Sequence, residues 1–210
     1  MNKNVTIAGN IDINVTHNAF AKADLTRYYY DNIPDYETIT EMPKKNMDFI
    51  NNVKYAVNCR AMFYHCKKLV SIDLSKFNTK QVTDMGSMFM DCNSINEIDL
   101  SNFDTSKVTF ISHMFDMCTN LHSLNISNWD TSSVTDMSYI FNNCISLVTI
   151  KGTLDLSSCT KVDGMFKNCS IKGLHLKNVP RTLLDSDGSL SLADGTLNKT
   201  YIIDNILEDK

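Results

Sequence analysis

The chain has 210 residues, 43% hydrophobic and 21% charged, which is the composition of a folded domain with a sizeable core. Its net charge is -4, its pI is about 5.7, and no run of Lys or Arg exceeds two residues, so nucleic acid is excluded as an expected partner. No segment approaches the roughly 18 apolar residues of a membrane helix, and no apolar stretch typical of a secretion signal follows Met1. We therefore expect neither direct membrane insertion nor an obvious signal peptide.

Residues 1–50 lie outside the repeat that follows them. Apolar and polar residues alternate over 11–15, as in a strand, and Pro34 and Pro43 mark a loop-rich passage. The simplest interpretation is an N-terminal cap for the repeats. The alternative is a segment, with Tyr28 to Tyr30, that docks onto a larger assembly.

About five repeats of 26 residues occupy residues 51–180. Residues at equivalent positions of successive repeats form rows of similar chemistry. One such row is aromatic, and a cysteine follows each of its residues three positions later. The aromatic row is Phe63, Phe89, Phe115, Phe141 and Phe166, and the cysteine row is Cys66, Cys92, Cys118, Cys144 and Cys169. Cysteines at such regular intervals indicate a repeat rather than a disulfide framework.

Within each repeat, the spacing of the apolar residues changes from every second position to every third or fourth position. This change predicts the secondary structure of the repeat. Alternating patterns predict short strands at 72–74, 98–100, 124–126 and 174–176. Met85, Met88, Phe89 and Cys92 have the i, i+3, i+4, i+7 spacing of a helix, and Thr83 precedes them as an expected cap. Each coil is therefore expected to contain a strand, a loop and a short helix.

Stacked coils bury continuous apolar rows that include the methionines. Strands lie about 4.8 Å apart and packed helices about 8–10 Å apart, so the strand side is expected to be concave. The cysteines are expected to be reduced and to act as small hydrophobic residues.

The fourth repeat is one residue short. We place the deletion at its strand, which aligns Asp155 with Asp104 and Asp130. A strand at 154–156 is the alternative. Residues 181–210, which include Tyr201 to Asp204, are expected to form the C-terminal cap.

The motif Leu-Ser-x-Phe-Asx-Thr-x-x-Val-Thr-Asp-Met-x-x-Met-Phe-x-x-Cys-x-x-Leu recurs, with small departures, at residues 74–95, 100–121 and 126–147. It resembles the repeat of BspA-like leucine-rich-repeat surface proteins, which is also similar to repeats in phage and prophage tail proteins. The expected fold class is an α/β solenoid, a leucine-rich-repeat right-handed superhelix with a concave parallel sheet, short convex helices and a cap at each end.

The resemblance implies a non-enzymatic recognition or adhesion module, either a bacterial surface adhesin or a phage tail or virion component. Its partner would be a host cell-surface or matrix protein or a glycan, with other virion or tail proteins as further candidates and oligomerisation open. The location implied is the bacterial cell surface or the virion. The alternative function is a scaffold whose repeats act as a spacer and whose termini make the contacts.

The concave face is the usual binding surface of a solenoid. A solvated polar face without a ligand is the alternative. The candidate partner-binding residues are Ser71, Asp73, Ser75, Glu97, Asp99, Ser101, Ser123, Asn125, Ser127, Lys151 and His175.

Cofactors, metals and catalysis are not expected. Asp73, Glu97 and Asp99 could contribute oxygens to a calcium ion, but two stacked strands rarely supply six or more ligands. Cys59 and Cys66 belong to different core rows, which disfavours a zinc site. The five histidines show no spacing typical of a metal site or catalytic triad, and no phosphate-binding glycine loop is present.

Overall fold

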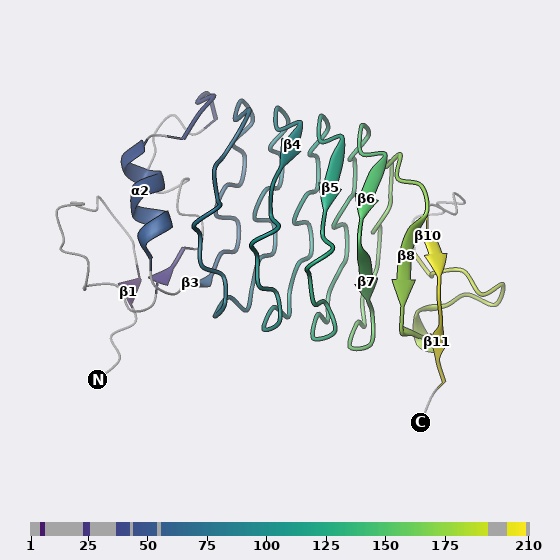
Figure 1. The fold of residues 1–210 in the computed structure, drawn as a ribbon. Helices are drawn as coiled ribbons and strands as arrows, with labels where there is room; N and C mark the ends of the chain where they lie inside the picture. Colours follow the sequence, from purple (N-terminus) through teal and green to yellow (C-terminus); the bar gives the residue numbers. More distant parts are fainter. Residues whose placement is uncertain are drawn as a thin grey trace.

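The computed structural model describes residues 5–6, 23–25, 37–42, 44–53, 56–192 and 201–208. The chain forms a β-solenoid whose coils lie side by side along one axis (Figure 1). All pairings between its strands are parallel, because each coil returns to the same side after a full turn. The predicted solenoid of stacked coils is therefore confirmed.

One side of the solenoid, which we call the strand face, carries a parallel sheet of β4 (Glu97–Ile98), β5 (Ser123–Asn125) and β6 (Thr149–Lys151). Glu97 pairs with Ser123, and Ser123 pairs with Thr149, so neighbouring strands are one repeat apart. β4 and β5 each begin one residue before the predicted strands at 98–100 and 124–126. At the expected strand 72–74, the described contact is a single bridge from Ser71 to Glu41.

A second parallel ladder runs along another side of the coils. It starts with β1 (Val5–Thr6), β2 (Ala23–Asp24) and β3 (Ala56–Asn58), which form one sheet. Single bridges then continue it through the middle coils. These bridges join Asn58, Asp84, Phe110, Asp136 and Lys161 in succession.

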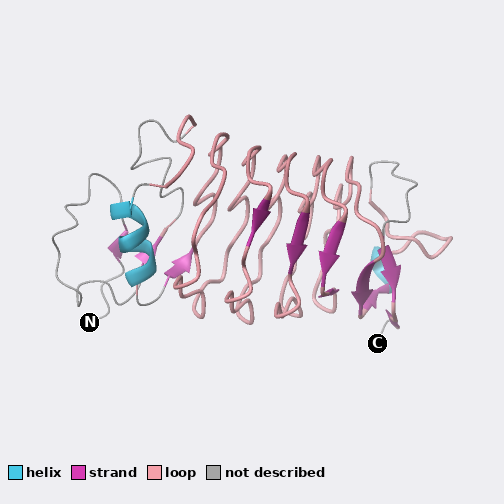
Figure 2. Ribbon diagram, turned by 45° about the horizontal axis from the view of Figure 1, so that its top comes forward, coloured by secondary structure: helices cyan, strands magenta, loops and turns pink. Residues whose placement is uncertain are grey.

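The helix expected over Met85 to Cys92 does not form, and this prediction is wrong. The segment is a series of tight turns, and the turn face that the coils build in this way is drawn as loop throughout Figure 2. Ser87 and Asp91 have positive φ angles of 55° and 62°, which no α-helix tolerates. The segment makes i→i−3 turn bonds, as from Met88 N–H to the Met85 carbonyl at 3.2 Å. The apolar spacing fits four-residue turns as well as it fits a helix.

The N–H groups between those turn bonds reach the next coil instead. Ser87 and Phe89 donate to the carbonyls of Ser112 and Met114 at 2.9 and 3.0 Å, and the pattern recurs in the coils at 61–65, 111–117 and 137–143. The expected Thr83 cap is also absent, because its hydroxyl donates to the Val57 carbonyl of the preceding coil at 3.4 Å. Both faces of the solenoid therefore have hydrogen-bonded backbone.

This second set of hydrogen bonds removes the reason for the expected curvature. The rings of Phe63 and Phe89 stack with centroids 5.1 Å apart, and those of Phe141 and Phe166 lie 6.2 Å apart. Packed helices would separate the coils by about 8–10 Å on this side. The spacing mismatch that predicts a concave sheet does not exist here, so the expectation of a concave strand face loses its physical basis.

The core consists of the rows that the repeat defines. All five Phe rings of the aromatic row are at most 1% exposed, and each contributes about 1.5–3 kcal/mol through burial. The seven cysteines are thiols rather than disulfides, and six of them are buried. The thiols of Cys92 and Cys118 donate to the Phe63 and Phe89 carbonyls of the preceding coil at 3.1 Å. These cysteines therefore both fill the core and bond to the backbone.

The missing residue of the fourth coil lies just after β6. Lys151 keeps the 26-residue register with Asn125, whereas Asp155 aligns with Asp130 one residue short, as predicted. Gly152 bridges the change with φ of +127°, and a Cβ there would lie 2.8 Å from the Ile126 backbone. A second strand, β7 (Thr153–Asp155), then pairs with β8 (Leu174–Lys177). The deletion therefore lies next to β6, close to where it was predicted, and a strand also forms near the alternative position at 154–156.

The C-terminal strands extend the stack. β10 (Tyr201–Ile203) pairs with β8, and β11 (Ile206–Leu207) pairs with β9 (Val179–Pro180), which leads into the 3-10 helix η1 (Arg181–Leu183). The strand predicted at 174–176 is confirmed. A cap over residues 181–210 is not confirmed, because the described strands add a further layer instead of covering the last one.

At the N-terminal end, α2 (Lys44–Asn52) buries Ile50 against the core. The strand predicted over 11–15 and the Tyr28 to Tyr30 segment lie outside the described residues, so neither the cap nor the docking alternative for 1–50 is tested. In the described part of the chain, no helix has the length and apolar character needed to cross a bilayer.

Candidate binding surface on the strand face

Ten of the candidate residues follow the strand face, as the repeat predicts, whereas His175 lies on β8, in the sheet with β7 and β10. Ten of the eleven are exposed and Asn125 is half-buried. They flank the inward-pointing row of Ile98 and Leu124, so the alternation of the strands positions them.

Three of these residues have a structural role that the sequence analysis missed. Asp73, Asp99 and Asn125 each accept a hydrogen bond from the backbone N–H two residues later, which makes an Asx turn where the strand row ends. The donors are Ser75, Ser101 and Ser127, at 3.0, 2.9 and 3.1 Å. The recurrent Asx-x-Ser spacing is the sequence signal for these turns.

The turns also affect ionisation. The Ser75 hydroxyl and backbone N–H hold the pKa of Asp73 below its usual value. The Ser101 hydroxyl and backbone N–H lower the pKa of Asp99 in the same way. Both carboxylates are therefore ionised at neutral pH, although each already accepts hydrogen bonds on one oxygen.

An open hollow of about 510 Å³ lies across three coils of the strand face. It brings together six of the eleven candidates and adds two aliphatic residues. The six are Ser71, Glu97, Asp99, Ser101, Ser123 and Asn125, and the two additions are Ile72 and Ile98. Sequence reasoning assigned Ile72 and Ile98 only to the core, because alternation cannot show that an inward row is incompletely covered.

The hollow is acidic. Glu97 and Asp99 line it, and none of its eight lining residues is a Lys, Arg or His. Glu97 is exposed, and its carboxylate has no described ion pair or hydrogen bond. A group that enters the hollow therefore meets two negative charges above an aliphatic floor.

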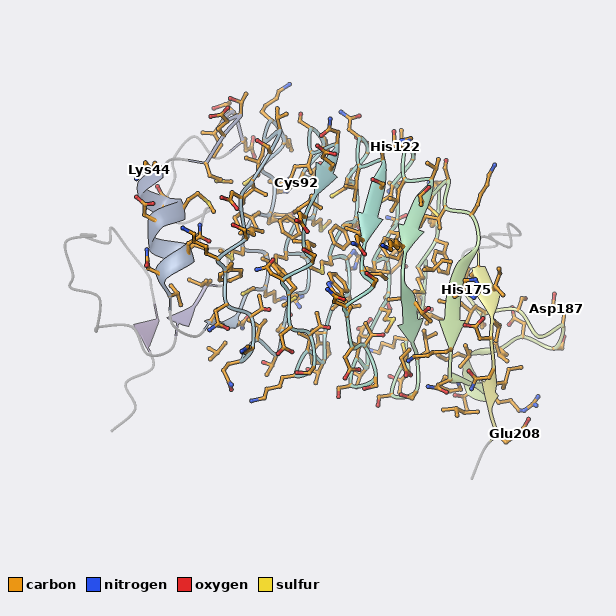
Figure 3. The ribbon with its side chains drawn as sticks, in the orientation of Figure 1. Lys44, Cys92, His122, His175, Asp187 and Glu208 are labelled. Atoms are coloured by element: carbon orange, nitrogen blue, oxygen red, sulfur yellow. The ribbon has the colours of Figure 1, made fainter. Side chains whose placement is uncertain are left out.

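The other candidates lie outside the hollow. They are Asp73, Ser75, Ser127, Lys151 and His175. Lys151 pairs with Asn125 of β5, whereas His175 pairs with Thr153 of β7 and with Ile202 of β10, so the two candidates do not occupy equivalent positions. Figure 3 shows it on β8 at the C-terminal side, where its Nδ1 lies 2.7 Å from Asp204 Oδ1.

In the described part of the chain, no three His, Cys, Asp or Glu side chains gather in an arrangement that could hold a metal ion. One oxygen each of Asp73 and Asp99 is already used by the Asx turns. The strand face thus offers single carboxylates rather than a set of calcium ligands.

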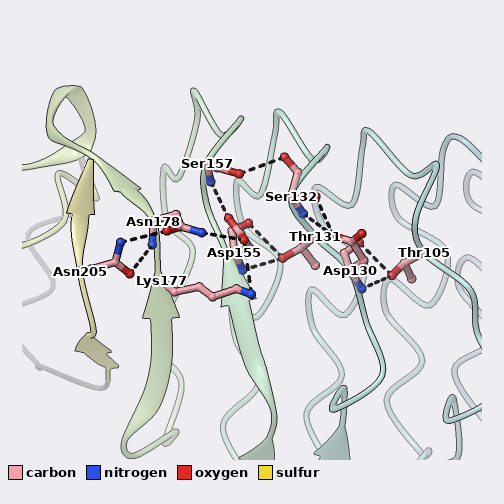
Figure 4. A network of polar contacts seen from close by, with 9 residues as sticks. All are labelled: Thr105, Asp130, Thr131, Ser132, Asp155, Ser157, Lys177, Asn178 and Asn205. Atoms are coloured by element: carbon pink, nitrogen blue, oxygen red, sulfur yellow. Dashed lines mark hydrogen bonds and ion pairs between the residues drawn. The ribbon is translucent and has the colours of Figure 1, made fainter. Parts of the chain in front are cut away.

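A polar network that the sequence analysis did not identify ties the C-terminal strands to the solenoid (Figure 4). Asn178 Nδ2 donates to Asp155 Oδ2 at 2.8 Å, and the Lys177 ammonium lies 3.4 Å from the same oxygen. Asn178 and Asn205 exchange two bonds of 2.9 Å. Burial alone would raise the pKa of Asp155, but bonds from Ser157 and Asn178 lower it overall. These contacts are structural.

Two histidines pair with buried aspartates on the turn face, although their spacing in the sequence does not suggest it. His65 Nδ1 contacts Asp91, and His113 Nδ1 lies 2.8 Å from Asp116 Oδ2. The His113 ring also stacks on Tyr139 at 4.8 Å. The His65–Asp91 pair joins residues one repeat apart and so links two neighbouring coils, whereas the His113–Asp116 pair lies within one coil.

The rows, the parallel ladders and the strand face define a leucine-rich-repeat-like solenoid. A family model described as "Mycoplasma protein of unknown function, DUF285" matches residues 57–178, more than half of the chain, and the chain belongs to this family.

A solved structure with similarity to this chain is that of a leucine rich cell surface protein from Faecalibacterium prausnitzii A2-165, at 21% sequence identity and a TM-score of 0.47. The similarity covers 85% of this chain and 44% of that protein, so the chain spans less than half of that protein's length. No curated protein matches the sequence.

Proposed function

We propose that this protein is a non-enzymatic recognition module that binds a macromolecular partner through the strand face. The observation that supports this function is the hollow, where Glu97 and Asp99 stand without a cationic neighbour above Ile72 and Ile98. Exposed charges that the fold does not neutralise favour association with a partner of opposite charge.

The chemistry of the hollow favours a protein partner over a glycan. A Lys or Arg side chain can lay its methylene stem on Ile72 and Ile98 while its charge meets Glu97 or Asp99. The lining contains no aromatic ring on which a sugar could stack. The preferred ligand is therefore an extended, basic segment of a surface or matrix protein.

The setting we propose is the outside of a bacterial cell, as an adhesin, with a phage tail or virion as the second setting. The resemblance of the repeats to those of BspA-like surface proteins supports the adhesin. In both settings the solenoid presents its strand face and the ends make the remaining contacts.

A spacer or scaffold is the second candidate function. The Asx turns favour it, because Asp73 and Asp99 already serve the fold through their bonds to Ser75 and Ser101. In a scaffold the strand face would be a solvated surface, and charge changes there would leave partner binding intact.

The experiment measures binding of the purified protein to intact bacterial cells and to immobilised mammalian matrix proteins. The test variant is Glu97→Gln with Asp99→Asn, which removes both charges yet keeps the turn, since Asn125 makes the same turn in the next coil. We expect at least a tenfold loss of binding. A basic peptide as competitor should produce the same loss.

The matched control is Asp104→Asn with Asp130→Asn. Both carboxylates also make Asx turns, to Ser106 and Ser132, but lie outside the hollow. The control should bind as the wild type does. Equal binding by wild type and test variant would disprove the strand-face function and support the scaffold, as would an absence of binding to cells and matrix.

A further inference from the structure

The hollow on the strand face lies where the parallel ladder is interrupted. β4 pairs with β5 on one side, but on its other side the described structure contains no backbone hydrogen bond between residues 71–74 and 97–100. Ser71 makes its bridge with Glu41 instead. Described coils border this interruption on both sides, so it is not an end of the stack. Backbone N–H and C=O groups that face it favour a ligand with donors and acceptors of its own, such as a polypeptide segment.

The two carboxylates of the hollow have a fixed spacing. Glu97 and Asp99 are exposed, whereas Ile98 and Leu100 are buried, so both carboxylates lie on the same side of the strand. Two residues of a strand rise by about 6.6 Å. In an extended segment that lies against this face, side chains point alternately toward the protein and away from it. Positions i and i+2 of such a segment therefore match both the side and the spacing of the two carboxylates.

The charge pattern of the strand face favours a segment that lies along β4 rather than across the coils. The row that crosses the coils at this position consists of Asp73, Asp99, Asn125 and Lys151. Its members lie about 4.8 Å apart from coil to coil, which does not match the spacing of i and i+2. A basic segment that follows this row also meets the Lys151 ammonium. Along β4 it meets Glu97 and Asp99, and none of the eight residues that line the hollow is a cation.

We propose that the hollow selects an extended segment with Lys or Arg at alternate positions, and that this segment lies along β4. The inference rests on the proposed function, because it concerns the partner of the same surface. The two basic side chains pair with Glu97 and Asp99, and their methylene stems cover Ile72 and Ile98. The residue between them points away from the protein, so its type has little effect on binding.

Three short, fluorescently labelled peptides of identical composition test the spacing. Each carries two lysines among serines and threonines, at i and i+2, at i and i+1, or at i and i+3. Fluorescence anisotropy with the full chain should show about fivefold tighter binding of the first peptide, because each of the others places only one lysine on the protein. In the variant Glu97→Gln this preference should disappear, because one carboxylate of the pair remains.

The orientation is tested by Asp99→Asn and its matched control Asp73→Asn. Both carboxylates make the same Asx turn, and Asn125 shows that an asparagine makes it too. Asp99→Asn should weaken binding of the i, i+2 peptide about fivefold. Asp73→Asn should leave it unchanged, because Asp73 lies outside the hollow. Equal losses in the two variants would mean that the segment crosses the coils, which would overturn the proposed orientation.

Two further outcomes separate this inference from the proposed function. If all three peptides bind equally and the variant Glu97→Gln with Asp99→Asn binds none of them, the strand face still binds basic segments, but the spacing inference is wrong. If no peptide binds the wild type, the hollow is closed to basic segments, or another part of the chain or a second copy fills it, and the inference is overturned. Binding of the double variant to cells and matrix then decides the proposed function on its own.

Discussion

The middle coils and the C-terminal end share the aromatic row, but their aromatic residues differ in how far they are buried. Phe115 stacks on Phe89 and Phe141 at 5.8 and 6.1 Å and is 1% exposed. Tyr201 continues the stack at 5.4 Å from Phe166, but it is only half-buried because no described ring lies on its other side. In a solenoid, a residue type therefore stabilises a coil only as far as both neighbours cover it.

Truncation of the aromatic row should show the largest effect. Phe115→Ala removes a ring packed on both sides and should lower the free energy of unfolding by about 3–5 kcal/mol. Tyr201→Ala should cost less, because its ring stacks on one described ring, although the variant also loses the bond that the Leu190 N–H donates to the Tyr201 hydroxyl at 2.8 Å. Urea unfolding followed by circular dichroism compares the two. Equal losses would contradict the comparison between the middle and the end.

Gly152 and Gly188 offer the same comparison for the backbone. Gly152→Ala places a Cβ 2.8 Å from Ile126 backbone at a φ of +127°, and we expect a loss of about 2–4 kcal/mol. Gly188 also has a positive φ, +79°, but its Cβ would meet nothing within 4 Å, so Gly188→Ala should cost about 1 kcal/mol. Thermal unfolding measures both, and the reverse order would contradict the tight approach at Gly152.

The buried threonines give a smaller effect. Thr105 donates to the Asp130 carbonyl at 3.0 Å and accepts from the Asp130 N–H at 2.8 Å. Thr105→Val leaves both groups without this partner and should cost about 1–3 kcal/mol. Thr135 is the control, because its hydroxyl makes one described bond, to the Thr109 carbonyl, and its Val variant should lose less. Chemical denaturation midpoints report the difference.

The smallest predicted effect is on pH dependence. Bonds from Ser106 and Ser132 lower the pKa of Asp104 and Asp130. Since these pKa values are lower in the folded chain, the stabilisation is present above the unfolded pKa, near pH 4, and is lost as the pH falls through the folded value. Asp104→Asn with Asp130→Asn should flatten this decline in unfolding midpoints between about pH 5 and pH 3. If the unfolding midpoint of the variant falls with pH as it does in the wild type, the loss of stability at low pH comes from other carboxylates.

The sequence alone predicted the rows, the register and the strand face, because a repeat allows each position to be checked several times. The same analysis failed at the helices. The spacing Met85, Met88, Phe89 and Cys92 matches a helix, but it also matches successive turns whose left-handed positions recur every four residues. Residues that tolerate this conformation, among them Asp91, Asn143, Asn168 and Gly164, occupy such positions and could have indicated the turns.

The sequence predicted where the candidate residues lie, but it did not predict their hydrogen bonds or the aliphatic side chains beside them. Alternation placed Glu97 and Asp99 outward, and the hollow contains both. It could not show that Asp99 is bonded to Ser101, or that Ile98 forms part of the floor, because both depend on how a turn closes and how far a neighbour covers a side chain. The C-terminal network of Asp155, Asn178 and Asn205 joins strands of irregular spacing, which a fixed period does not reveal.

The cysteine row places one reactive atom at the same depth in successive coils. Burial raises the pKa of Cys66 to about 12 and that of Cys159 to about 11, and it also raises the pKa of Cys92 well above the usual thiol value. Because alkylating reagents attack the thiolate, each buried thiol should react only when its own coil opens. Labelling followed by mass spectrometry would thus measure the rate of local unfolding of each coil separately. The half-buried Cys169 should react first.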